Sequence, residues 1–231
     1  MLGILYDLGI APDLVLKAVT LDKQDFEKVM RMLVGQLMYD LEHFQKQDLF
    51  DLRDDELKYY LKNFYKEIIF DRKADLIMCE VKSGRWGIIE VPSDFVFVAE
   101  KYYGSVRDFF EYFAYGIKDK LVYKDVDIVR YKLPLAVVWS SFSFSLLLEA
   151  LANFLLFKAE KANLEKYLVQ FFTELTQEAR VDGIVCEIDR DKWVFFRSAR
   201  EFIRFVKKHY GSIEKFVEEE SLGVLFYGGY L

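Results

Sequence analysis

The acidic side chains of residues 75–82 are the ones whose type and spacing could carry chemistry. Asp75 opens a segment with strand character, and the run Glu80-Val81-Lys82 follows it. Two carboxylates that point the same way can share a divalent cation. Side chains alternate between the two faces of a strand, so Asp75 and Glu80, five positions apart, point to opposite sides. One strand alone therefore does not build a metal site from these two acids.

A second arrangement brings Asp75 together with Glu90. Asp75 and the run Glu80-Val81-Lys82 resemble the Asp…Glu-x-Lys signature of the PD-(D/E)xK nucleases, and that resemblance implies a metal-dependent nuclease. A two-residue turn after Lys82 would pair Ile77 with Glu90 and place Glu90 diagonal to Asp75 on one face. Asp75 and Glu90 are thus the candidate catalytic residues. With Glu90 as the second acid, the nuclease pattern requires a lysine two residues later, and Pro92 stands there. We therefore expect no metal or other cofactor, and the enzyme remains an alternative.

The strongest pattern in the sequence is an internal repeat with an offset of 107 residues. Residues 57–111 and 164–218 are identical at 17 of 55 positions without a gap, where chance would give roughly 3 or 4. The repeated pairs with chemical or structural character are Asp75/Asp182, Cys79/Cys186, Glu80/Glu187, Trp86/Trp193 and Gly104/Gly211. The repeat predicts a lead-in (residues 1–13) and two tandem α+β copies (14–120 and 121–231), related by a pseudo-two-fold axis.

The repeated aspartates also have a structural interpretation. Asp75 and Asp182 would each start the first strand of a hairpin and bond to the backbone or to a neighbouring base. In the second copy Arg197 stands in place of Glu90. The acid pair of the first copy therefore becomes an expected ion pair between Asp182 and Arg197.

One repeat predicts the element order β-α-α-β-β-α-α. Apolar residues at helical spacing mark the helices, and β-prone runs around Ser83-Gly84 mark a hairpin. Gly104 is a predicted helix stop and Ser105 the cap of the next helix. The expected elements are a strand at 14–21, helices at 25–47 and 54–70, the hairpin, and helices at 94–102 and after Ser105.

The cysteines and tryptophans of the repeat are predicted to be structural. The chain holds no CxxC motif and only two histidines, which argues against a zinc site. In the predicted hairpin, Cys79 shares a face with Trp86, and Cys186 with Trp193. We therefore predict core thiols, with a disulfide as the less favoured alternative, and core tryptophans rather than stacking platforms.

Residues 133–157 and 224–231 are the most apolar stretches. The first carries a single charge, Glu149, while its counterpart at 26–50 is strongly charged. Equivalent segments should occupy equivalent places, so we predict a buried or interface helix rather than a membrane span. The tail is predicted to be a partial extra strand that could pair with a partner. The candidate interface residues are Trp139, Phe142, Phe144, Leu147, Phe226 and Tyr227.

Composition narrows the class of protein further. The net charge is −6 and the sequence pI near 5.2, with no Lys/Arg-rich run, so a nucleic-acid partner is not favoured. High charge with few amides predicts a thermophile protein. The first residues carry acids where a signal peptide needs bases, which predicts a cytoplasmic location.

The sequence therefore favours a non-enzymatic interaction or scaffold module. It would use the apolar helix 133–157 and the tail 224–231 to bind a protein partner or a second copy of the chain. The nuclease-like enzyme around Asp75 and Glu90 is the first alternative. A small-ligand sensor with an aromatic pocket is the second.

Overall fold

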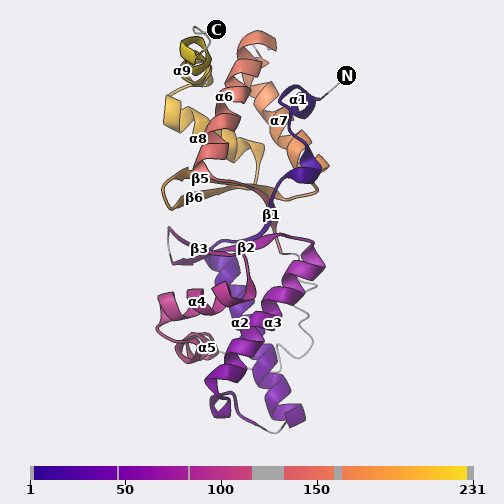
Figure 1. Ribbon diagram of the computed structural model, residues 1–231, viewed down its shortest axis with the longest axis vertical. Helices are drawn as coiled ribbons and strands as arrows, with labels where there is room; N and C mark the ends of the chain where they lie inside the picture. Colours follow the sequence, from indigo (N-terminus) through magenta and orange to yellow (C-terminus); the bar gives the residue numbers. More distant parts are fainter. Residues whose placement is uncertain (1–2, 46, 83, 116–132, 159–162, 228–231) are drawn as a thin grey trace. The chain divides into compact units, whose positions relative to one another are not determined.

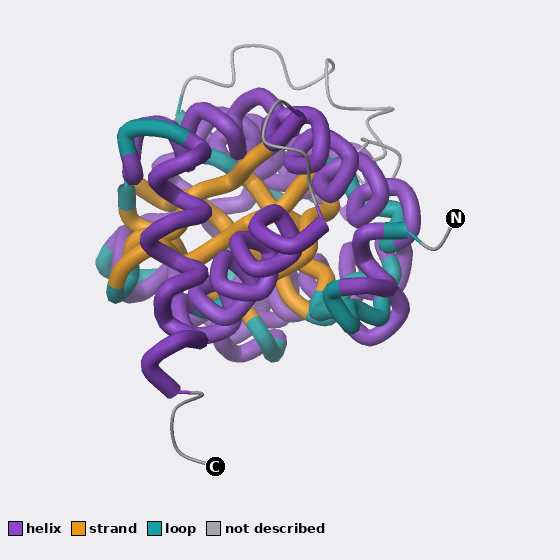
Figure 2. Tube along the Cα trace, turned by 90° about the horizontal axis from the view of Figure 1, so that it is seen from above, coloured by secondary structure: helices purple, strands orange, loops and turns teal. Residues whose placement is uncertain are grey.

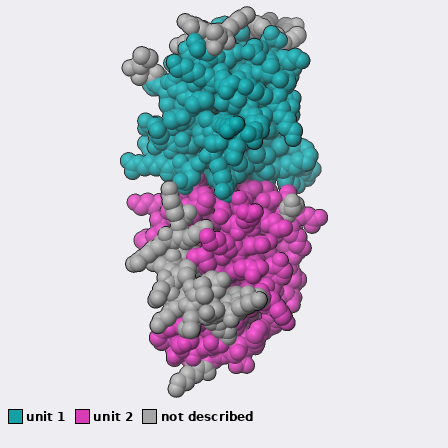
Figure 3. All heavy atoms as spheres, turned by 180° about the vertical axis from the view of Figure 1, so that it is seen from behind, with its two compact units in different colours: residues 1–17, 136–231 teal, residues 18–135 magenta. Residues whose placement is uncertain are grey.

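The computed structural model describes residues 3–45, 47–82, 84–115, 133–158 and 163–227. The chain divides into two compact units (Figure 3). Unit 1 comprises residues 1–17 and 136–231, and unit 2 comprises residues 18–135. Both units contain helices and strands, and Figure 2 colours the chain by these kinds of element. The fold is therefore of the α+β class that the repeat predicts, but unit 1 is assembled from both ends of the chain.

Unit 2 runs strand, two helices, hairpin, two helices. A π-helical turn (Leu41–Gln45) and a 3-10 turn (Leu49–Asp51) lie between its first two helices. Its strands and helices are β1 (Lys17–Leu21), α2 (Lys23–Asp40), α3 (Asp54–Arg72), β2 (Leu76–Lys82), β3 (Arg85–Ile89), α4 (Pro92–Tyr103) and α5 (Val106–Ala114).

Unit 1 has the same order after its N-terminal segment. That segment holds α1 (Ile4–Asp7) and a 3-10 turn (Pro12–Leu14). The remaining elements are β4 (Leu135–Trp139), α6 (Ser141–Lys158), α7 (Leu164–Glu178), β5 (Gly183–Asp189), β6 (Lys192–Phe196), α8 (Ala199–Tyr210) and α9 (Ile213–Tyr227).

Each unit contributes three described strands, which run in mixed directions. In unit 2, β1 pairs parallel to β2 and β2 antiparallel to β3; in unit 1, β4 pairs parallel to β5 and β5 antiparallel to β6. A parallel pair needs a long crossover connection, and α2–α3 and α6–α7 supply it. The helices of each unit lie on one side of its strands (Figure 1). Each unit thus has three described strands covered by one helical layer.

Local capping explains where several helices begin and end. The Asp22 carboxylate accepts a hydrogen bond of 2.9 Å from the Asp25 N–H at the start of α2. Helix α2 ends at Asp40 and continues as the π-helical turn, so its predicted end at residue 47 is wrong. Gly104, with φ of +100°, ends α4, and Ser105 caps α5, as predicted.

The predicted apolar helix 133–157 is wrong at its start. Residues Leu135–Trp139 form strand β4, and α6 begins at Ser141. Proline disfavours helix at the preceding residue, and the Val137-Val138-Trp139 run has strand propensity. The Ser140 carbonyl then accepts the Phe144 N–H at 2.8 Å and starts the helix.

The shift of β4 and α6 also shows that a gapless offset of 107 does not hold throughout. β5, β6 and α8 begin 107 residues after β2, β3 and α4. β4 and α6 begin 118 residues after β1 and α2, because the connection from α6 to α7 is shorter than that from α2 to α3. The strand predicted to open the second copy, near residues 121–128, lies outside the described residues.

Both ends of the chain depart from their predictions. The lead-in belongs to unit 1, because Ile4 and Leu5 are buried in its core. The Leu5 N–H donates a hydrogen bond of 3.4 Å to the Glu174 carboxylate on α7. Residues 223–227, expected as an extra strand, continue helix α9, and residues 228–231 lie outside the described part of the chain.

Each unit has an aromatic core with one ring pair in the same place. Phe64 of α3 and Phe95 of α4 have centroids 5.9 Å apart at 44°. Phe171 of α7 and Phe202 of α8 have centroids 6.2 Å apart at 46°. All four rings are buried, and they join the two helices that flank each hairpin.

Candidate functional site

The hairpin of unit 2 separates the two candidate catalytic acids. A β-bulge after Glu80 shifts the register, so that Ile77 pairs with Ile89 and not with Glu90. By the alternation of side chains, Glu90 follows the opposite face from Asp75. The Glu90 backbone N–H donates to Asp94 Oδ2 at 3.0 Å, where α4 begins. The predicted diagonal pair is therefore wrong.

The repeated aspartates, Asp75 and Asp182, lie one residue before the strands that they were expected to start. β2 begins at Leu76 and β5 at Gly183, so each aspartate occupies the bend before its strand, where it is exposed. Aspartate is depleted in strands and favoured in turns, because its side chain can hydrogen-bond to nearby backbone. Each aspartate therefore lies directly before the first strand of its hairpin, one residue earlier than predicted. The ion pair of Asp182 with Arg197 stays a prediction.

The repeated Glu80 and Glu187 serve as structural ties. Glu80 Oε2 accepts the Lys23 N–H at 3.2 Å, at the first turn of α2, and Oε1 accepts the Gly84 N–H at 2.6 Å in the hairpin turn. Glu187 accepts the Ser141 N–H at the first turn of α6 and the Asp191 N–H in the turn of its own hairpin, each at 3.0 Å. Each carboxylate joins a helix N-terminus to a hairpin turn.

The hydrogen bonds to Glu187 also change its acidity. Partial burial raises the pKa of this carboxyl, but the Ser141 and Asp191 N–H groups and the Ser141 hydroxyl outweigh that effect. The net result is a pKa below the ordinary glutamate value.

The repeated cysteines are buried free thiols, as the core-thiol prediction expects. Burial raises the pKa of Cys79 to about 12 and that of Cys186 well above its ordinary value, so neither is an activated nucleophile. Trp86 pairs with Glu80 and Trp193 with Glu187, on the opposite face from the cysteines. Both tryptophans are half-buried, so their predicted place beside the thiols is wrong.

The candidate interface residues of α6 lie on different sides of the helix. Phe144 and Leu147 belong to the core of unit 1 and are not available to a partner. Trp139, at the end of β4, is half-buried against that core, whereas Phe142 is 72% exposed. Phe226 and Tyr227 lie in the last turn of α9.

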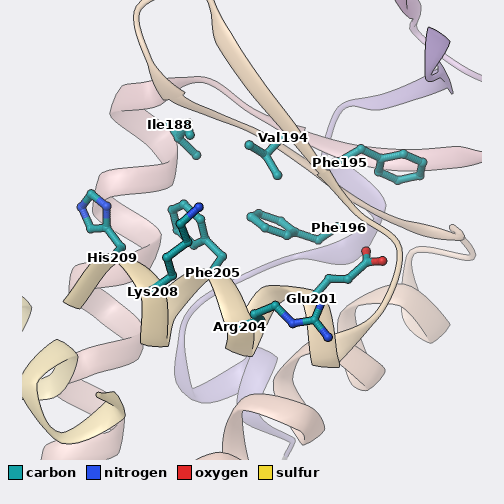
Figure 4. Close-up of a pocket in the computed structure, with 9 residues that line it drawn as sticks. All are labelled: Ile188, Val194, Phe195, Phe196, Glu201, Arg204, Phe205, Lys208 and His209. Carbon is teal, nitrogen blue, oxygen red and sulfur yellow. The ribbon is translucent and has the colours of Figure 1, made fainter. Parts of the chain in front are cut away.

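The main candidate site is a pocket between hairpin β5–β6 and helix α8, hereafter the α8 pocket (Figure 4). Its volume is about 570 Å³, and all of its lining residues belong to unit 1. The lining residues are Ile188, Val194, Phe195, Phe196, Glu201, Arg204, Phe205, Lys208 and His209. The apolar members come from the strands and from Phe205, and the charged members come from α8.

Ring contacts fix the floor of the pocket. The Phe205 centroid lies 5.3 Å from that of Phe196 on β6 and 6.1 Å from that of Phe144 on α6. The His209 ring lies parallel to Phe205, at 14° and 5.7 Å between centroids. The floor is thus a packed aromatic surface held by three elements.

Helix α8 holds the charged rim in place. Ser198 caps this helix by accepting the Glu201 N–H at 3.3 Å, and Glu201 Oε2 in turn accepts the Arg197 N–H at 2.7 Å. Over the described residues, neither a hydrogen bond nor an ion pair engages Arg204 or Lys208. The rim therefore combines one carboxylate, whose Oε2 is hydrogen-bonded to Arg197, with two cations that are available to a ligand.

The corresponding region of unit 2 is packed differently. Gly87 and Val98 stand 107 residues before Val194 and Phe205. A Cβ added at Gly87 would lie 3.0 Å from Val98 Cγ2, so Val98 sits directly over the glycine. Helix α4 also packs on β3 more extensively than α8 packs on β6. Larger side chains at both positions of unit 1 hold α8 away from the strand and leave the pocket.

The sequence prediction missed the pocket, although the repeat held a signal for it. Several of its residues, such as Val194 and Arg204, differ in size or charge from their counterparts Gly87 and Phe97, whereas Lys208 matches Lys101. Identical pairs such as Glu80/Glu187 and Gly104/Gly211 instead support the shared backbone.

Among the described residues, no group of three or more His, Cys, Asp or Glu side chains is placed to hold a metal ion. Nor does any helix in that part of the chain combine the length and apolar character that crossing a membrane requires. Comparisons with protein-family models, curated proteins and solved structures found no match for this chain.

Proposed function

We propose that this protein binds a small organic anion with an apolar body in the α8 pocket, as a ligand-sensing module. The observation that carries the proposal is the pairing of an aromatic floor with two rim cations, Arg204 and Lys208. The volume of about 570 Å³ falls within the range of small-molecule sites, roughly 300–1,000 Å³. A few charged groups around an apolar floor are the usual composition of such sites.

The energetics favour weak to moderate affinity for a one-ring ligand. Burying a phenyl group contributes roughly 2–3 kcal/mol, and one charge-assisted hydrogen bond roughly 1.5–3 kcal/mol. Part of that gain offsets the entropy of association. We therefore expect dissociation constants of roughly 0.1–1 mM for a single-ring acid.

Calorimetric titration with phenylacetate, 2-naphthoate and octanoate tests the proposal. Phenylacetamide, which lacks the charge, is the matched ligand control and should bind more weakly. The Arg204→Gln/Lys208→Gln variant should weaken binding of the acids by roughly tenfold. Lys207→Gln is the matched protein control, because Lys207 pairs with Glu165 at 2.6 Å. Equal affinity of acid and amide, or no saturable binding, would overturn the proposal.

A second candidate, the protein-interaction module, is favoured by the exposed apolar side chains of α6. Phe142 and Phe157 are 72% and 79% exposed, and Leu146 and Leu156 lie on the same surface of the helix at about half exposure. Light scattering of Phe142→Lys/Leu146→Lys tests it. A folded variant with unchanged association would exclude this surface.

The nuclease-like site, the cytoplasmic location and the thermophile origin rest on the sequence alone. A nuclease-like site at Asp75 and Glu90 gains nothing from the hairpin register, and a thermal shift with Mg²⁺ that Asp75→Asn abolishes would be its test. The cytoplasmic location and the thermophile origin stay predictions.

We also infer that the two units arose by duplication of one α+β unit. The two units share the order of their elements, and β2, β3 and α4 are equally spaced from their counterparts. Glu80 and Glu187 also accept equivalent hydrogen bonds from a helix N-terminus and a hairpin turn. Asp75 and Asp182 add to it, because each occupies the bend before the first strand of its hairpin. The pseudo-two-fold relation between the units stays a prediction.

A further inference from the structure

We infer that the ligand of the α8 pocket is a phosphate ester that carries an aromatic ring, a class that includes aryl phosphates and nucleoside phosphates. The inference rests on the proposed function and names the chemical class of its ligand. Two observations carry it: a row of cations that extends beyond the pocket, and a floor suited to a flat ring.

The row of cations consists of Arg200, Arg204 and Lys208, four residues apart on the exposed face of α8. Four residues of helix advance about 6 Å, so the row extends over roughly 12 Å. Throughout the described ranges, none of the three takes part in a hydrogen bond or an ion pair. Arg204 and Lys208 line the pocket, and Arg200 lies one turn beyond its rim.

The charge of α8 is not a reflection of overall composition. Helix α8 has four basic residues and one acid, a net charge of +3, whereas the chain as a whole carries −6. Its counterpart α4 has one basic residue and two acids, a net charge of −1. Ser93 and Phe97 stand there in place of Arg200 and Arg204. The positive row therefore belongs to the unit with the pocket.

The number of cations favours phosphate over carboxylate as the ligand's head group. A carboxylate brings one negative charge. A phosphate monoester brings about 1.5–2 negative charges and three acceptor oxygens, which the fork of Arg204 and the ammonium of Lys208 can share. A second phosphate on the same ligand would reach toward Arg200.

The lining of the pocket favours an aromatic ring as the ligand's body. Apart from its charged rim, the lining includes no amide, hydroxyl or thiol side chain, so the interior of the pocket suits an apolar ring. Phe205, with His209 parallel to it, offers the flat surface on which aromatic rings stack. Glu201 Oε1 adds one acceptor at the rim for an exocyclic amine.

A series of ligands with the same aromatic ring and increasing negative charge tests the inference. Adenosine, AMP and ADP are titrated into the full chain by calorimetry, with phenylacetate, phenyl phosphate and inorganic phosphate alongside. AMP should bind at least about tenfold more tightly than adenosine, and ADP roughly threefold more tightly than AMP. Phenyl phosphate should bind more tightly than phenylacetate, and inorganic phosphate should bind weakly for lack of a ring.

Substitutions of the three cations show which phosphate of the ligand each cation binds. Arg204→Gln/Lys208→Gln should remove most of the advantage of AMP over adenosine. Arg200→Gln should remove the advantage of ADP over AMP and leave AMP unchanged, and Lys207→Gln should change neither.

The outcomes separate this inference from the proposed function. Binding of phenylacetate with no preference for AMP over adenosine would overturn the phosphate class and leave the anion pocket standing. A preference for AMP that survives loss of Arg204 and Lys208 would also overturn it. Absence of binding by every acid and phosphate would overturn both.

Discussion

The strand–helix pair β3–α4 of unit 2 and its counterpart β6–α8 of unit 1 have the same backbone elements but pack differently between strand and helix. Both strands have five residues, both helices twelve, and each helix ends at a glycine with positive φ, Gly104 or Gly211. Between strand and helix the pairs diverge. Gly87 under Val98 gives close packing, whereas Val194 and Phe205 leave a pocket. One backbone thus supports a closed and an open form through the size of two side chains.

The shared skeleton gives the largest expected effect. Phe95→Ala and Phe202→Ala should each destabilise the protein by roughly 3–5 kcal/mol, because each removes a buried ring from the same helix–helix contact. Urea denaturation followed by circular dichroism measures both, with the exposed Phe97→Ala as a control of small effect. A cost below about 1 kcal/mol for either ring would mean that the two cores are not equivalent.

The closed pair should tolerate added bulk poorly. Gly87→Val should cost roughly 1–3 kcal/mol, since the new side chain would collide with Val98. Val194→Ile, at the matching position beside the pocket, should cost less than about 0.5 kcal/mol. Denaturation midpoints of the two variants measure the two losses of stability. Equal losses would show that the space between β6 and α8 is no larger than that between β3 and α4.

The open pair should lose its site when given the residues of the closed one. Val194→Gly/Phe205→Val should weaken binding of aromatic anions by roughly tenfold, because smaller side chains let α8 approach β6 and remove the ring floor. Calorimetry on the folded variant measures the loss, with Phe205→Leu as a control that keeps much of the bulk. Unchanged affinity would place the ligand elsewhere.

The smallest expected effect concerns the Glu187 tie. Its lowered pKa means that its ionised form stabilises the fold above the ordinary glutamate pKa. That contribution should disappear as the pH falls through the lowered value. Melting temperatures of wild type and Glu187→Gln, measured between pH 6 and pH 3, should differ at the upper end and converge at the lower. A constant difference would exclude the linkage.

Local signals in the sequence were sufficient for much of the fold. The hairpins, α3, the stop at Gly104 and the cap at Ser105 follow from turn and capping chemistry that acts over a few residues. The start of β4 could not be found in the same way. Its residues are as apolar as those of α6, and the gapless alignment assigned both to one helix. Pairing with β5 holds Leu135–Trp139 extended, and this pairing is between segments that are far apart in the sequence.

The candidate site was harder to predict for two physical reasons. The bulge after Glu80 moves every later residue of the hairpin to the other face, which separates Asp75 from Glu90. The pocket depends on the volume that two facing side chains leave between elements. Such a difference is visible only after helix and strand are placed.

The double hydrogen bonding of Glu187 has a consequence for motion. The carboxylate of Glu187 binds Ser141, 46 residues earlier in the first turn of α6, and also binds Asp191 at the tip of the hairpin beside the pocket. Fraying of that helix end and swinging of the hairpin tip therefore become one cooperative event. A ligand that enters the pocket by displacing the hairpin should therefore increase the rate of amide hydrogen exchange at Ser141.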